Sequence, residues 1–274
     1  MVRTKRRVAL GLVLVMVYTL GGCGNQVPPD DDTPPEIPPQ STFKMDFSDF
    51  EEEDGTATTR VAQALPGSNW NYSAGVVVVW STIVAVTLAV PVAAFVESFN
   101  HEPERQTDGS WVWSYDVTVD DDVYTASLSA KAQGGDINWK MLVSKEGEYT
   151  DFEWFTGVSN LIGTEGEWTL NRDPDDPELF IQIDWTRDPD SQTGSLQYTN
   201  IVPGGLLNGG YIMAATSEEE PFDARYHVYD NLAQNLTEIE WNLESLDGRV
   251  KDERHFEDED WHCWDVALQN ADCG

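Results

Sequence analysis

Basic residues are scarce in this 274-residue chain. It contains 16 lysines and arginines against 49 aspartates and glutamates, so its formal net charge is −33. A surface this negative repels nucleic-acid phosphates and anionic lipids, which argues against both as partners. We interpret the acids as a solvating surface of the kind found in proteins from salt-loving organisms. Calcium loops are the alternative, but no acidic run combines ordered ligand spacing with a glycine turn.

A recognisable catalytic motif is also missing. The histidines at positions 101, 227, 255 and 262 are scattered, and no serine lies in a G-x-S-x-G elbow. The glycine pairs within residues 204–210 do not form a phosphate loop. We therefore predict no catalytic residue, no cofactor and no metal site. A carbohydrate-active enzyme stays as an alternative, because carboxylates are numerous enough to supply a pair such as Glu153 and Glu167.

Cysteine is limited to Cys23, Cys263 and Cys273. Cys263 and Cys273 have nine residues between them. If Cys23 pairs with neither, these two would most simply form a disulfide in an exported chain. His262 stands beside Cys263, but zinc takes three or four ligands and only two such residues are adjacent. The pattern favours a disulfide in an oxidising compartment.

The N-terminus contains a basic stretch followed by an apolar run. Four basic residues within positions 3–7 precede the apolar residues 8–20, and two glycines then lead to Cys23. This segment resembles a bacterial lipoprotein signal peptide with the lipobox Leu20-Gly21-Gly22-Cys23. The resemblance implies cleavage before Cys23, a diacylglyceryl thioether on its sulfur and acylation of the new N-terminus. An ordinary secretory signal or an uncleaved membrane helix is the alternative, although the apolar run is shorter than the about 20 residues of a span.

The residue after the lipobox cysteine is Gly24. In Gram-negative lipoproteins an aspartate at that position is commonly the signal for retention in the inner membrane, so the resemblance implies transport to the outer membrane. We expect a cell-envelope protein that is lipid-anchored there and faces the periplasm or the cell exterior. Its expected partners are the membrane, through Cys23, and either another envelope protein or a hydrophobic ligand.

Composition divides the chain into four parts. Residues 1–22 are the signal peptide, and residues 23–42 are the lipidated cysteine with a spacer rich in proline and aspartate, which favours extended polyproline geometry. Residues 43–65 are acidic with scattered apolar side chains, and we predict a poorly ordered segment or a short docking segment. Residues 66–274 are predicted to form the folded domain.

No charged residue occurs between positions 61 and 96. Small side chains recur there at every fourth position from Ser81 to Ala93, beside a row of larger ones, which predicts one apolar helix near 74–96. Pro91 should kink this helix near Thr87, whose carbonyl loses its donor. The stretch is also long enough to span a membrane. Because acids follow it, where a cytoplasmic flank would carry lysine and arginine, we favour a buried helix.

From residue 111 onward, apolar and polar residues alternate in about ten short segments separated by turn residues. The pattern predicts a mainly β protein, in which an antiparallel meander of about ten strands forms a half-barrel or barrel-like sheet around the apolar helix. One face of the sheet should be solvated. This arrangement is similar to the half-barrels of periplasmic lipoprotein carriers, and the likeness is one of architecture alone.

Four tryptophans end a short recurring pattern of an apolar residue, an acid or amide, and tryptophan: Trp139, Trp154, Trp185 and Trp241. We interpret them as core residues that fill the space between a curved sheet and a helix. Alternatively, Trp139, Trp185 and Trp241 line a cavity for a hydrophobic ligand. The expected function is a non-catalytic binding or structural module of the envelope, with a lipid carrier and a carbohydrate-active enzyme as alternatives.

Overall fold

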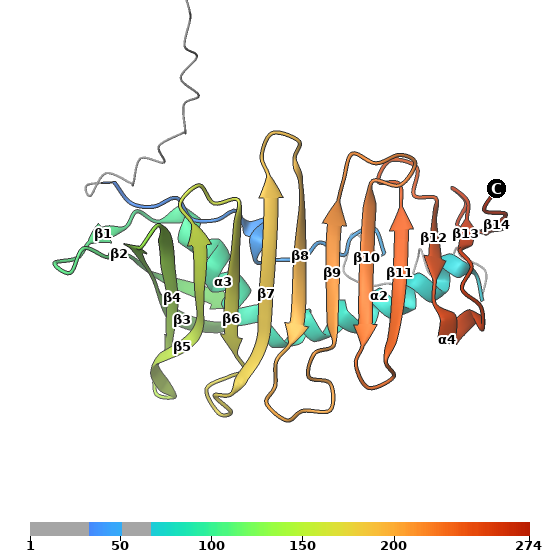
Figure 1. Ribbon diagram of the computed structural model, residues 1–274. Coiled ribbons are helices and arrows are strands. Elements are labelled where there is room, and N and C mark those ends of the chain that lie inside the picture. Colours follow the sequence, from blue (N-terminus) through green and yellow to red (C-terminus); the bar gives the residue numbers. More distant parts are fainter. Residues whose placement is uncertain (1–32, 51–66) are drawn as a thin grey trace, which may run out of the picture.

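The computed structural model describes residues 33–50 and 67–274; residues 1–32, which include the predicted signal peptide and Cys23, and residues 51–66 lie outside these ranges. The described strands form one antiparallel sheet in which every strand pairs with its neighbours in sequence, from β1 at one edge to β14 at the other. Figure 1 shows this meander as a long, twisted sheet. The predicted fold class is confirmed, with fourteen strands in the described residues rather than about ten.

The strands are mostly of six to twelve residues, and the short ones lie at the two edges. They are β1 (Glu104–Arg105), β2 (Trp111–Val119), β3 (Asp122–Gln133), β4 (Asp136–Lys145), β5 (Tyr149–Asn160), β6 (Glu165–Asn171), β7 (Leu179–Asp188), β8 (Thr193–Asn200), β9 (Tyr211–Thr216), β10 (Ala224–Asp230), β11 (Asn235–Trp241), β12 (Gly248–Lys251), β13 (His262–Trp264) and β14 (Asn270–Ala271).

The predicted single helix is divided into α2 (Asn69–Thr87) and α3 (Ala89–Glu97). The break is at Leu88, whose φ of −106° and ψ of 9° are not helical. Pro91 is the third residue of α3 and has no N–H to donate to the carbonyl of Thr87, so the chain bends where the sequence predicts. Short helices are η1 (Gln40–Thr42), η2 (Ser98–Asn100) and α4 (Glu253–Phe256).

The two long helices lie across one face of the sheet, which we call the inner face (Figure 1). Asn69 Nδ2 donates to the carbonyl of Cys263 at 2.8 Å, which fixes the start of α2 to β13. At the other end, the hydroxyl of Tyr115 in β2 donates to the carbonyl of Ala94 in α3 at 2.6 Å. By length and composition α2 is the one described helix that could cross a membrane, and 33% of the tested stretch is buried.

On the inner face of the sheet, tryptophan lies opposite glycine on neighbouring strands. Gly157 of β5 pairs with Trp139 on one side and Trp168 on the other, and Gly166 of β6 pairs with Trp185. A Cβ on Gly157 would lie 2.2 Å from the Trp168 ring, so these indoles cover backbone that only glycine leaves open. Glycine in a strand interior commonly marks such a close approach. The tryptophan rings thus cover the sheet backbone at the glycine positions.

The segment 37–50, which we call the strap, also packs on the inner face. Phe43, Met45, Phe47 and Phe50 are all buried in the core. Of the two alternatives predicted for 43–65, residues 43–50 fit the short docking segment and not the poorly ordered one, and the packed chain begins before residue 42, since Pro38 is already buried. The apolar side chains at 43, 45 and 47 share one side of an extended chain, but the acids around them lowered the average hydrophobicity.

Candidate functional site

The strap is held on the sheet by aromatic side chains that hydrogen-bond to it. These donors come from four different strands, so the strap crosses the sheet and closes part of its inner face. The contacts are Trp168 Nε1 to the carbonyl of Thr42 (3.1 Å), the Tyr198 hydroxyl to the carbonyl of Phe43 (2.8 Å), the Tyr226 hydroxyl to the carbonyl of Asp46, and Trp241 Nε1 to the carboxylate of Asp49 (3.0 Å). Burial raises the pKa of the Tyr198 hydroxyl, which keeps it protonated as a donor.

A cleft of about 600 Å³ opens between the strap and the ends of β7 to β11. We call it the strap cleft. Leu196, Tyr226 and Trp241 contribute apolar and aromatic surface, while Lys44 and Arg225 contribute positive charge. The volume is within the range of small-molecule sites, about 300–1,000 Å³.

The carboxylates that line the strap cleft are already engaged. Asp188 accepts the backbone N–H of Asp190 at 2.9 Å within the β7–β8 turn, and Asp49 accepts Trp241 Nε1. By contrast, Lys44 and Arg225 make no ion pair within the described part of the chain. The strap cleft therefore offers free cationic groups in a protein whose other charges are overwhelmingly negative.

The three tryptophans predicted to line a ligand cavity lie in different places. All are core residues, with exposed fractions of 2% for Trp139 and Trp185 and 5% for Trp241. Trp241 lines the strap cleft, and Trp185 lines a second hollow of about 550 Å³ formed mainly by polar residues of the outer face. Trp139 lines neither and donates from Nε1 to Ser159 Oγ at 2.9 Å. The structure does not bring the three together around one cavity.

The carboxylate pair considered for glycoside hydrolysis is widely separated. Glu153 lies on β5 and forms an ion pair with Lys140 at 3.3 Å. Glu167 on β6 is opposite Val158, five residues further along β5. At about 3.3 Å per residue this spacing is roughly 16 Å, beyond the about 5–9.5 Å that glycosidase pairs require. These two residues cannot act as such a pair.

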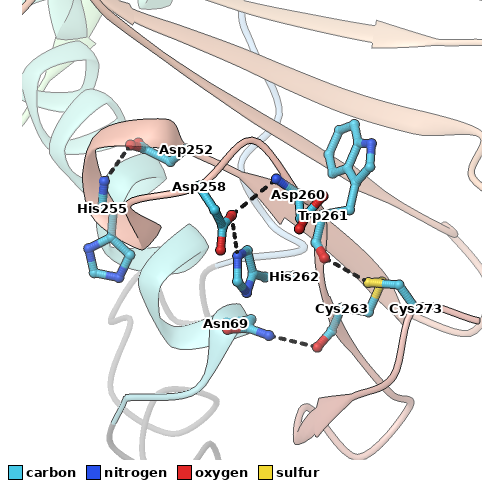
Figure 2. A network of polar contacts seen from close by, with 9 residues as sticks. All are labelled: Asn69, Asp252, His255, Asp258, Asp260, Trp261, His262, Cys263 and Cys273. Atoms are coloured by element: carbon cyan, nitrogen blue, oxygen red, sulfur yellow. Dashed lines mark hydrogen bonds and ion pairs between the residues drawn. A yellow bond between two sulfur atoms is a disulfide. The ribbon is translucent and has the colours of Figure 1, made fainter.

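The predicted cysteine pair lies at the C-terminal edge of the sheet. Cys263 of β13 and Cys273 are at disulfide distance, with their sulfur atoms 2.17 Å apart. The Sγ of Cys273 is also 3.0 Å from the carbonyl oxygen of Trp261, a contact that a disulfide sulfur makes without donating hydrogen (Figure 2). Closing so short a loop contributes about 2–3 kcal/mol to stability.

A buried carboxylate organises the same edge. Asp252 is 1% exposed and accepts hydrogen bonds from Tyr72 Oη (2.6 Å), Asn235 Nδ2 (3.0 Å), Thr237 Oγ1 and the N–H of His255 (2.9 Å), the last as the N-cap of α4 (Figure 2). Burial alone would raise the pKa of the Asp252 carboxyl, but these hydrogen bonds outweigh it and hold the pKa below its usual value. This carboxylate joins α2, β11 and α4, which makes its role structural.

The histidines near this edge are used in stacking. The ring of His255 lies 3.7 Å from that of Tyr72, and the ring of His262 lies 3.7 Å from that of Phe256. Figure 2 shows the contact between His262 Nε2 and the Asp258 carboxylate, at 3.0 Å. Within residues 33–50 and 67–274, no three His, Cys, Asp or Glu side chains come together as metal ligands. The sequence-level prediction of Cys23 lipidation concerns a residue outside these ranges.

Sequence reasoning missed the strap cleft, because it placed the strap outside the folded domain. The available signal was the alternation of Phe43, Met45 and Phe47, which matches the two-residue period of the strands. Comparison with known proteins yields no match: no family model, no curated protein and no solved structure is similar to this chain.

Proposed function

We propose that this protein is a lipid-anchored cell-envelope protein, attached to the outer membrane through Cys23, and that its strap cleft binds an anionic, partly apolar molecule without converting it. The lipobox at residues 20–23 supports the anchor. The pair of unpaired cations in the strap cleft supports the binding function, and it is the observation that carries this proposal.

The charge distribution of the strap cleft favours an anionic ligand. Several cations that the structure describes form ion pairs, for example Arg249 with Glu240 at 2.6 Å, whereas Lys44, Arg187, Arg225 and Arg254 form none within the described residues. Lys44 and Arg225 border the strap cleft, where Asp49 and Asp188 are engaged in hydrogen bonds, and Glu240, which lies opposite Arg225 in the β10–β11 register, is paired with Arg249. A ligand carboxylate, sulfate or phosphate would contact Lys44 and Arg225 directly, and partial enclosure by the strap would strengthen that attraction relative to open water.

The walls of the strap cleft favour a ligand that is also apolar. The edges of Leu196, Tyr226 and Trp241, which are otherwise buried, line the same space that Lys44 borders. Aromatic and aliphatic walls with a few polar groups are typical of small-molecule sites. The lipid-carrier alternative is a special case of this binding function, located in the strap cleft rather than between the sheet and α2, where Ala74 and Val77 are fully buried.

The binding function can be tested with the dye 1-anilinonaphthalene-8-sulfonate, which is both anionic and aromatic. Fluorescence titration should give one saturable site per chain, and Lys44→Ala combined with Arg225→Ala should weaken it about tenfold, because two charge-assisted contacts are lost. The matched control removes two paired cations from elsewhere, Lys131→Ala with Lys140→Ala, and should leave the affinity unchanged. Equal weakening in both double variants would contradict the proposal.

The anchor is tested separately on the protein extracted from its native membrane in high salt. The intact mass should equal the chain from Cys23 plus its acyl groups. A stoichiometric amphipathic anion that copurifies with this protein, and is lost in the Lys44→Ala, Arg225→Ala variant, would identify the natural ligand class. A mass that retains residues 1–22, or shows no acyl groups, would contradict the lipoprotein part of the proposal.

A further inference from the structure

Three leucines are exposed at the tips of two loops. Leu206 and Leu207 in the β8–β9 loop are 77% and 54% exposed, and Leu232 in the β10–β11 turn is 63% exposed. Single exposed leucines are ordinary in soluble proteins, but neighbouring ones on a strongly acidic chain are unusual. Neither loop, residues 201–210 or 231–234, contains a charged side chain. We call these three residues the leucine tips.

The two loops form one surface. Asn231 Nδ2 in the β10–β11 turn donates to the carbonyl of Asn208 in the β8–β9 loop at 2.7 Å. Within the larger loop, the N–H of Gly210 donates to the carbonyl of Leu207 at 2.9 Å, and the N–H of Gly205 donates to Val202 at 3.0 Å. The leucine tips are therefore presented by loops that are tied together before any partner binds, which lowers the entropic cost of binding.

The leucine tips lie at the opposite end of the strands from the strap cleft. β8 runs from Thr193, beside the strap cleft, to Asn200, at the start of the leucine-tipped loop. In Figure 1 the β8–β9 and β10–β11 loops are at the lower end of the sheet, and the β7–β8 turn is at the upper end. A surface that binds the leucine tips would leave the strap cleft open on the far side.

Several features of these loops suit an apolar phase. Backbone groups that enter hydrocarbon must keep their hydrogen bonds inside the protein, and much of the β8–β9 loop does so. The side-chain Nδ2 of Asn208 donates to the carbonyl of Val202 at 2.7 Å, and the carboxylate of Asp230 accepts the backbone N–H of Leu232 at 2.9 Å. Leucine side chains are stabilised by leaving water, and no ion pair would have to be broken.

We infer that the leucine tips insert into the neutral lipid surface to which the protein is anchored, and so fix the orientation of the domain with the strap cleft facing away. This inference rests on the proposed anchoring at Cys23. From Cys23 to Thr33, the first described residue, the chain has ten residue steps, or about 35 Å when extended. The described chain begins at the upper end of the sheet in Figure 1, so the inferred orientation requires this tether to extend along the strands toward the leucine tips. Because the chain carries a net charge of −33, zwitterionic lipid should be preferred over anionic lipid.

The orientation is tested on the lipidated protein reconstituted in phosphatidylcholine vesicles. A polarity-sensitive nitrobenzoxadiazole label is attached at Leu206→Cys or, as the matched control at the opposite end of the strands, at Asp190→Cys. The emission of the Leu206→Cys label should shift to shorter wavelength and be quenched by spin-labelled lipid at least threefold more than that of the control. Equal quenching at the two sites would overturn the inference.

A second measurement separates the leucine tips from the anchor. The chain from residue 23 with Cys23→Ser should float with neutral vesicles, and Leu206→Ser with Leu207→Ser and Leu232→Ser should reduce this partition at least tenfold. A matched control that removes exposed apolar side chains from elsewhere, Ile162→Ser with Val123→Ser, should leave the partition unchanged. Unchanged flotation of the triple variant would overturn the inference even if Cys23 is lipidated. If the native protein carries no acyl group on Cys23 but flotation still depends on the leucine tips, only the proposed anchoring would be contradicted. A label that responds in native envelopes and not in pure lipid would point to a protein partner and overturn the lipid assignment.

Discussion

The two faces of this sheet follow the same two-residue alternation but use polar groups differently. On the inner face the polar atoms of Trp168, Tyr198 and Trp241 donate to the strap. On the outer face the polar groups meet water and one another, as in the ion pair between Lys140 and Glu153 at 3.3 Å. Glu167 and Asp184 are even directly opposite each other there, an arrangement that only a solvated surface tolerates well.

The difference indicates where stability resides. Inner-face side chains are buried, and several of them also hydrogen-bond to the strap, so removing one leaves a cavity or an unpaired group. Outer-face ion pairs are screened and are each worth about 0–1 kcal/mol. Substitutions should therefore divide by face rather than by residue type, and the following predictions test this division.

The largest effect is expected at Phe43 of the strap. Its ring is buried and lies 4.7 Å from that of Phe95 and 4.8 Å from that of Phe155, measured between ring centroids. Phe43→Ala should lower the free energy of unfolding by about 3–5 kcal/mol, through lost burial and a cavity. Urea denaturation followed by tryptophan fluorescence measures this change.

The control for Phe43→Ala is Lys44→Ala, next to it on the strap and exposed. It should change the free energy of unfolding by no more than about 0.5 kcal/mol. If Phe43→Ala were as mild as Lys44→Ala, the strap would not belong to the cooperative core, and the contrast between the faces would fail at its first test.

A smaller but pH-dependent effect is expected at Asp252. Asp252→Asn keeps the shape but weakens the acceptor of four hydrogen bonds, so the free energy of unfolding should fall by about 1–3 kcal/mol at pH 7. Because the folded-state pKa is lowered, the stabilisation by the wild-type carboxylate is present above its unfolded pKa, near pH 4, and is lost as pH falls through the folded-state value. The difference in the free energy of unfolding between wild type and variant should therefore become smaller below pH 4.

Asp116→Asn is the matched outer-face control, because Asp116 is exposed and accepts only from Thr125 Oγ1 at 2.9 Å. Urea denaturation at pH 7 and pH 3 should show little change for this variant at either pH. A gap between wild type and Asp252→Asn that stays constant with pH would mean that the buried carboxylate is not the source of the effect.

Much of the fold could be predicted from sequence because the alternation is strong in the strands. Trp113, Tyr115 and Val117 alternate with polar neighbours and are buried as the two-residue period requires. The helix break followed from Pro91, whose missing N–H is a local chemical fact. The number of strands was underestimated because β1, β12, β13 and β14, at the two edges of the sheet, are only two to four residues long. Segments this short carry no periodic signal.

The strap cleft could not be predicted because it depends on a long-range contact. The strap meets Tyr198 and Tyr226, which are more than 150 residues away in sequence. Nothing local in residues 43–50 reports those partners, and their acidic composition indicates disorder when averaged. The free state of Lys44 and Arg225 is equally invisible, since it depends on which carboxylates the fold has already engaged.

The smallest effect is expected at His227 on the outer face of β10. Burial lowers the pKa of this imidazole, which the carboxylate of Glu238, 3.8 Å away, only partly offsets. The unfolded chain then takes up a proton near pH 6.5 that the folded chain resists, so wild-type stability should decline as pH falls from 7 toward the folded-state pKa. His227→Gln should match wild type within about 0.5 kcal/mol at pH 8 and become relatively more stable at pH 5. The other three histidines are common to both proteins, so they cancel in the difference between the two urea denaturation curves. If the free energies of unfolding of wild type and His227→Gln change in parallel with pH, His227 is as solvated as its outer-face neighbours. The division between the two faces would then hold even for a half-buried ring.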